Sequence, residues 1–151
     1  MKKTIFSILA TLTLLVPMAI IGFAGLSGRV KANVPFNFMV GDKEFKAGKY
    51  TVGQITSGRT GDILMIRSED NKDVANFNVN NTQGKGEPRA RLIFHRYGNQ
   101  YFLAKIFDSE SNDGAALLKS KSEREASKKR DVITQNAAEP EVVTVIAQVG
   151  R

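Results

Sequence analysis

The chain has 151 residues, with 22 lysine and arginine residues, 15 aspartate and glutamate residues, one histidine and no cysteine. This length accommodates a single domain beside an N-terminal segment. The lack of cysteine excludes disulfides, thiolate metal sites, cysteine nucleophiles and lipid attachment at a cysteine.

The N-terminus has the pattern of a secretory leader. A short basic start precedes an uncharged run over residues 4–28. Val30 and Ala32 then supply small side chains at the −3 and −1 positions of a signal-peptidase site, so the sequence predicts a signal peptide over residues 1–32, cleaved after Ala32. The alternative is an uncleaved anchor in contact with the membrane, because the uncharged run is long enough to span a bilayer. Both interpretations predict export, to the periplasm or the extracellular space.

The net charge of +7 depends largely on that leader. Four of the 22 basic residues lie in residues 1–32, which leaves 18 basic against 15 acidic residues in residues 33–151, a balance of +3. A nucleic-acid-binding domain would keep a large basic excess. The charge therefore argues against nucleic acid as a partner.

Residues 33–151 form one predicted domain of short strands separated by polar turns. Residues 34–40 alternate with the period of a half-buried strand. Ser120 and Glu123 match a capping box that opens a short surface helix over about residues 120–130. Further strands are predicted at residues 50–55, 62–67, 74–79, 91–97, 100–108, 115–118 and 142–149. The pattern predicts a mainly β fold, an antiparallel β-sandwich or open barrel of about eight strands with one short surface helix near the C-terminus.

Residues 91–108 are the strongest strand signal in the chain. Two apolar, aromatic-rich runs flank Gly98-Asn99, a dipeptide suited to a two-residue hairpin turn. Both faces of the hairpin carry apolar side chains, so we expect it to be the central pair of a sheet. The turn predicts four cross-strand pairs: Arg96 with Tyr101, His95 with Phe102, Phe94 with Leu103, and Ile93 with Ala104.

Several of these segments occur together in a recognisable combination. The motifs are VPFNFMVG at residues 34–41, AGKYTV at 47–52, FHRYG at 94–98 with YFLA at 101–104, and KSKSERE at 119–125. The combination resembles a group of small exported bacterial proteins with VPFxFxVG, AGxYxV and FHRYGxxYFL motifs. The chain departs from that group at Lys46, where proline is expected, which predicts a less rigid turn there. The resemblance implies export and a single domain, and implies no activity.

His95 is the only histidine, which excludes a multi-histidine metal site. Its predicted neighbours are apolar or aromatic, so the favoured interpretation is a structural histidine. The alternative is a catalytic base of a small hydrolase or lyase, with a carboxylate such as Asp108 nearby. The sequence has no GxSxG elbow to supply a nucleophile. No catalytic residue besides the candidate His95 is predicted, and no cofactor.

Two further sets of residues are candidate sites. Arg96, Tyr97 and Tyr101 are predicted to form a binding surface, because arginine and tyrosine are favoured at interface centres. Asp108, Glu110 and Asn112 have the alternate spacing of calcium ligands, but the loop lacks the glycine and glutamate that a calcium loop requires at its sixth and twelfth positions. A solvated turn is therefore the preferred interpretation of that loop.

Taken together, these patterns favour an exported β domain of the cell envelope that acts by binding or structural interaction rather than by catalysis. Its partner would be an envelope protein, a polymer or a small apolar ligand. A further alternative is the carriage of an apolar ligand inside a β-barrel, which requires an unfilled interior. The sequence does not indicate the oligomeric state.

Overall fold

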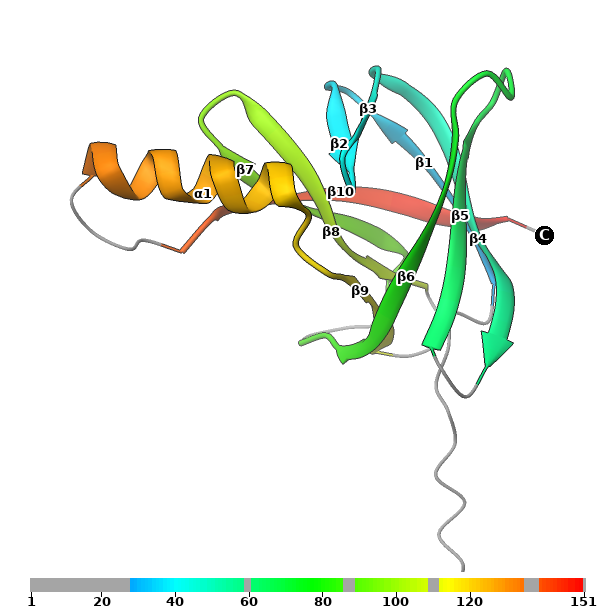
Figure 1. Ribbon diagram of the computed structural model, residues 1–151. Helices are drawn as coiled ribbons and strands as arrows, with labels where there is room; N and C mark the ends of the chain where they lie inside the picture. Colours follow the sequence, from blue (N-terminus) through cyan, green and yellow to red (C-terminus); the bar gives the residue numbers. More distant parts are fainter. Residues whose placement is uncertain (1–27, 59–60, 86–88, 109–111, 135–138, 151) are drawn as a thin grey trace, which may run out of the picture.

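The computed structural model describes residues 28–58, 61–85, 89–108, 112–134 and 139–150 (Figure 1). Within these ranges the chain forms ten strands and one helix. They are β1 (Arg29–Val34), β2 (Phe38–Val40), β3 (Lys43–Phe45), β4 (Gly48–Gly58), β5 (Gly61–Ser68), β6 (Val74–Gln83), β7 (Arg91–Tyr97), β8 (Gln100–Phe107), β9 (Asp113–Leu117), α1 (Lys121–Thr134) and β10 (Glu141–Gly150).

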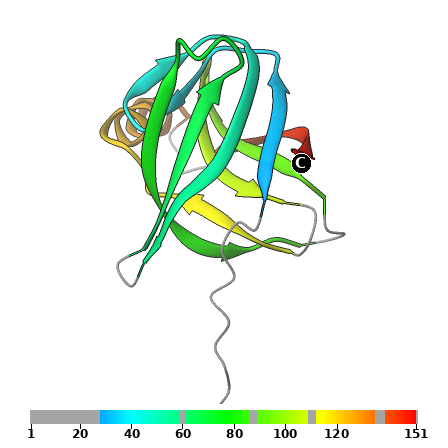
Figure 2. The ribbon, with the colours of Figure 1, turned by 90° about the vertical axis from the view of Figure 1, so that its right-hand side faces the viewer.

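Eight of the strands form a closed antiparallel barrel, seen from two directions in Figures 1 and 2. The order around the barrel is β1, β4, β5, β6, β9, β8, β7 and β10, and β10 pairs again with β1. The pairing of β9 with both β6 and β8 closes the ring. Two short strands lie outside this ring, because β2 runs parallel to β8 and β3 pairs with β2. The mainly β, antiparallel prediction is confirmed, and closure identifies the fold as a barrel rather than a sandwich.

The barrel interior is filled by alternate side chains of its strands. Val30, Val52, Ile66, Leu92 and Ile106 are each fully buried, from five different strands. Burying one such side chain stabilises the fold by about 1.5–3 kcal/mol. An aromatic cluster extends this core to the β2–β3 hairpin, with ring centroids 5.1 to 5.7 Å apart in four pairs; its members are Phe38, Phe45, Tyr50 and Phe94.

The β7–β8 hairpin has the predicted turn and part of the predicted register. Gly98 has a φ of 61°, the left-handed conformation that glycine adopts at no steric cost. The first three predicted pairs, from Arg96–Tyr101 to Phe94–Leu103, are confirmed. The fourth is wrong, because a bulge between Ile93 and Phe94 pairs Ile93 with Lys105 instead of Ala104. The bulge turns Ile106 into the barrel core.

The predicted strand over residues 34–40 is wrong in both position and extent. The chain leaves β1 after Val34 and resumes as β2 at Phe38, with Pro35 in the break. Proline has no N–H for a strand ladder, so it favours such a break. β1 itself begins at Arg29 and pairs with both β4 and β10. The predicted cleavage after Ala32 would therefore remove most of a strand of the closed barrel.

Helix α1 lies outside the barrel, beside the β7–β8 hairpin (Figure 1). It begins at Lys121, directly after the predicted cap Ser120, and runs to Thr134, four residues beyond the predicted end. The N–H of Glu123 donates to Ser120 Oγ at 3.1 Å, which confirms the cap. In its first ten residues, whose side chains the structure describes, the apolar contact is small, with Ala126 packed against Tyr97 and Phe102.

Candidate functional site

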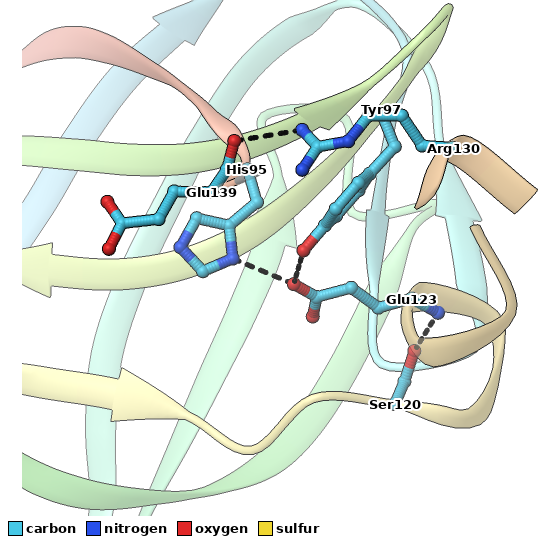
Figure 3. Close-up of polar contacts among 6 residues, drawn as sticks. All are labelled: His95, Tyr97, Ser120, Glu123, Arg130 and Glu139. Atoms are coloured by element: carbon cyan, nitrogen blue, oxygen red, sulfur yellow. Dashed lines mark hydrogen bonds and ion pairs between the residues drawn. The ribbon is translucent and has the colours of Figure 1, made fainter. Parts of the chain in front are cut away.

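The polar residues of the hairpin and the helix meet in one cluster, drawn in Figure 3. His95 Nδ1 lies 2.7 Å from Glu123 Oε1, and the hydroxyl of Tyr97 donates to the same oxygen at 3.3 Å. The Glu123 side chain is 6% exposed and the His95 side chain 19%. A nearly buried carboxylate is thus satisfied by two donors from a single strand, β7.

The local sequence explains why Glu123 reaches this position. It stands three residues after the cap, where the glutamate of a capping box normally bonds back to the backbone N–H of the cap residue. Here the Ser120 half of the box forms, but the Glu123 carboxylate bonds to His95 and Tyr97 instead. A carboxylate in the first turn also interacts favourably with the helix dipole. The helix start is therefore positioned by the barrel as well as by its own cap.

Two further contacts fix the helix against the barrel. Ser122 donates from its N–H and its hydroxyl to Asp42 Oδ1, at 3.0 and 2.7 Å, and these bonds lower the pKa of the Asp42 carboxyl. Near the other end, the Arg130 guanidinium lies 5.3 Å from the centre of the Tyr97 ring and donates to the carbonyl of Glu139 at 2.9 Å (Figure 3). The helix is anchored at both ends.

The chemistry open to this cluster follows from the proton positions. A carboxylate only accepts hydrogen bonds, so Nδ1 of His95 carries the proton in its contact with Glu123. In the neutral ring, Nε2 is then the acceptor, the arrangement of a general base oriented by a carboxylate. Burial, followed by the nearby Glu123 charge, raises the pKa of Tyr97. The predicted carboxylate partner of His95 was Asp108, and the structure places Glu123 there instead.

The predicted binding surface of Arg96, Tyr97 and Tyr101 is only partly exposed. Tyr97 is 4% exposed beneath the helix, so its assignment to an exposed surface is wrong. Arg96 forms an ion pair with Glu141 at 3.3 Å and lies 5.4 Å from the Tyr101 ring centre. Tyr101 is half-buried and stacks on Phe36, with centroids 4.0 Å apart. Arg96 and Tyr101 remain together at the surface.

The predicted weak metal site is only partly within the described residues. Asp108 is 2% exposed and Asn112 is half-buried, whereas Glu110 lies outside the described residues. Burial of Asp108 contradicts the solvated turn that the sequence predicts at this position. Among the residues that the structure describes, no group of three or more histidine, cysteine, aspartate or glutamate side chains is placed to hold a metal ion.

Sequence reasoning missed a basic groove on the outer face of β10, β1, β4 and β5. Its charged lining consists of Arg29, Lys31, Lys49, Arg67 and Glu69. The leader pattern places Arg29 and Lys31 in the segment predicted to be cleaved. The signal that identifies them is the polar–apolar alternation of residues 29–34, which is typical of a half-buried strand.

No protein-family model, curated protein or solved structure matches this chain. The resemblance to small exported bacterial proteins therefore stays a prediction from the motifs. Within the described residues, no helix has the length and apolar character needed to cross a bilayer.

Proposed function

We propose that this chain is an exported binding domain of the cell envelope that contacts its partner through the outer surface of the barrel. The observation that carries the proposal is the filled interior. Large side chains from the barrel strands and from β2 and β3 form one continuous core cluster. The interior of an eight-stranded barrel is either filled by its own side chains or holds one small ligand, and the continuous cluster of buried side chains supports the filled arrangement. A partner would therefore bind to the outer surface of the barrel.

Export is the second element of the proposal and rests on the leader. The basic start and the uncharged run over residues 4–28 support it. The participation of Arg29 to Val34 in the barrel moves the proposed cleavage site upstream of Arg29. Either the periplasm or the extracellular space would receive the folded domain.

The test is a fractionation and sedimentation experiment on the full chain expressed with its own leader in a bacterial host. We expect the processed protein outside the cytoplasm, and we expect the purified product to sediment with washed envelope fragments. A hydrophobic dye should show no more fluorescence with the folded product than with a filled β domain of similar size. A cytoplasmic product that ignores envelope fragments would overturn the proposal, and strong dye binding would favour the apolar-ligand carrier.

A second candidate function is hydrolysis or lyase chemistry with His95 as the base. The observation that favours it is the 2.7 Å contact of Nδ1 with Glu123, which orients the ring and leaves Nε2 as the acceptor. A partly exposed Nε2 would react with an acylating reagent, so His95 modification by diethyl pyrocarbonate measures its accessibility. Rapid modification that abolishes a turnover found in an ester or glycoside panel would support this candidate. Slow modification and no turnover would leave His95 as a structural residue.

A further inference from the structure

The outer face of the barrel carries a groove of about 640 Å³ that crosses four strands. Cross-strand pairing places Gln148, Lys31, Thr51 and Arg67 side by side, one from each of β10, β1, β4 and β5. Neighbouring strands lie about 4.8 Å apart, so this row is about 14 Å long. The groove is therefore extended across the strands rather than a compact hole.

The groove has an excess of positive charge that its single acidic side chain neutralises only in part. Four basic side chains and one acidic side chain line it. Lys49 forms an ion pair with Glu69 at 3.4 Å, and both side chains are largely exposed. Arg29, Lys31 and Arg67 are also exposed, and their side chains have no ion-pair or hydrogen-bond partner among the described residues. Three free cations along one groove attract an anionic ligand.

One glycine, Gly150, allows a cationic side chain of the groove to lie close to the sheet. A Cβ atom added to Gly150 would come within 2.7 Å of Lys31 Cε, so a larger residue there would displace the lysine. A Cβ added to Gly53 would lie 3.4 Å from Arg29 Cγ, an ordinary van der Waals contact, so Arg29 packs over this position without requiring glycine there. The stems of Arg29 and Lys31 thus pack along the barrel and direct their charges over the groove.

The uncharged lining indicates which anion fits. Amide and hydroxyl groups of Asn33, Thr51, Asn71 and Gln148 stand among the cations, and such groups both donate and accept hydrogen bonds with hydroxyls. The one aromatic residue of the lining, Tyr50, is 4% exposed and offers no stacking face. Base stacking on aromatic rings is the usual contribution to single-stranded nucleic-acid binding. Alternating charge and hydroxyl partners suit an acidic sugar chain instead.

We propose that this groove binds an acidic polysaccharide, with its carboxylates on Arg29, Lys31 and Arg67 and its hydroxyls on the neighbouring amides. The proposal rests on the envelope-binding function above and names the partner class. Arginine suits the role because its guanidinium binds carboxylates in a bidentate manner. Because the groove is exposed, binding should weaken as salt screens these charges over about 8–10 Å.

The experiment measures binding of the exported protein to polygalacturonate and to alginate by affinity electrophoresis at low salt. Neutral dextran is the polymer control. We expect Lys31→Glu combined with Arg67→Glu to weaken binding to the acidic polymers by at least about tenfold, since charge reversal replaces attraction with repulsion. The milder pair Lys31→Gln and Arg67→Gln should weaken it less, and preserves the test if charge reversal disturbs folding.

The matched control is Lys121→Glu combined with Lys128→Glu, which makes the same charge change at exposed positions of α1. Binding within twofold of the unaltered protein is expected for this control. Equal losses for the groove and helix variants, equal binding to dextran, or tighter binding to anionic vesicles or single-stranded DNA would overturn the proposal. If the unaltered protein still sediments with envelope fragments, only the groove assignment fails; if it does not, the proposed function fails as well.

Discussion

His95 Nδ1 and Glu123 Oε1 lie 2.7 Å apart, and this contact joins barrel strand β7 to the first turn of α1. The two residues are 28 positions apart in the chain. Over residues 121–130, the part of the helix whose side chains the structure describes, the buried apolar contact is small and made by Ala126. The polar cluster therefore supplies much of the specificity with which the helix docks on the barrel.

Glu123→Ala is expected to destabilise the protein by about 1–3 kcal/mol, because it leaves the buried Tyr97 hydroxyl without its acceptor. His95 is affected less, since its side chain is 19% exposed and can bond to water. Chemical denaturation followed by circular dichroism measures the change. Glu125→Ala is the control, at an exposed position of the same helix. Equal effects of the two substitutions would show that the Glu123 contacts contribute nothing specific.

Tyr97→Phe is expected to reduce the free energy of unfolding at neutral pH by about 1 kcal/mol, the usual net value of one hydrogen bond. The pKa of Tyr97 is raised above its ordinary value of 10, first by burial and then by the Glu123 charge. A raised pKa in the folded state means that the neutral hydroxyl stabilises the fold below about pH 10 and that this contribution is lost as the pH rises further.

The measurement is the unfolding free energy between pH 8 and 11 by urea titration. The unaltered protein should lose stability over the upper part of that range, and Tyr97→Phe should lose less. Tyr101→Phe serves as the comparison, because Tyr101 stacks on Phe36 and leaves Tyr97 in place. Identical alkaline profiles for the unaltered protein and Tyr97→Phe would contradict the assignment.

Asp42→Asn tests the link between the β2–β3 turn and the helix start. The two hydrogen bonds from Ser122 lower the pKa of the Asp42 carboxyl in the folded protein. A lowered pKa stabilises the fold above the unfolded value of about 3.9, and this contribution is lost as the pH falls through the folded value. The substitution should therefore reduce stability at neutral pH and flatten the loss of stability in acid. The free energy of unfolding, measured from pH 2 to 7, tests this, with Glu44→Gln at an exposed position as the control. The same pH dependence for Asp42→Asn as for the unaltered protein would count against the link.

The fold was predictable where local chemistry determines it. Gly98 determines the hairpin turn, and Ser120 determines where the helix begins. The bulge between Ile93 and Phe94 was not predictable. A bulge moves the side chains beyond it to the opposite face of the hairpin, and because both faces are apolar, the hydropathy pattern is the same with or without it. The same ambiguity hid that Ile106 lies in the core cluster together with its cross-strand partner Leu92.

The candidate site was half predictable. His95 stood out as a lone imidazole, and Glu123 as the acidic member of a capping box. Their contact depends on how α1 docks, which is a tertiary relationship that no local spacing encodes. The burial of Tyr97 has the same origin, since the ring is covered by a helix that begins more than twenty residues later.

Strand β1 overlaps the segment that the leader pattern predicts to be cleaved. Val30 is fully buried and Ala32 is 6% exposed, and both lie on β1 between β4 and β10. Removing residues 29–32 would cost about 2–4 kcal/mol from lost apolar burial alone. It would also leave β10 without its β1 partner, and β4 would keep only its pairs with Asn33 and Val34. We therefore expect the exported protein to begin upstream of Arg29.

Intact-mass measurement of the exported protein identifies its first residue. A chain beginning at Gly28 should unfold cooperatively, whereas a chain beginning at Asn33 should unfold at a markedly lower temperature or fail to fold. A natural N-terminus at Asn33, together with equal unfolding temperatures for the two chains, would show that β1 is dispensable. Because Arg29 and Lys31 also line the basic groove, a chain cut after Ala32 would lose two of the three cations to which we assign the carboxylates of the polysaccharide.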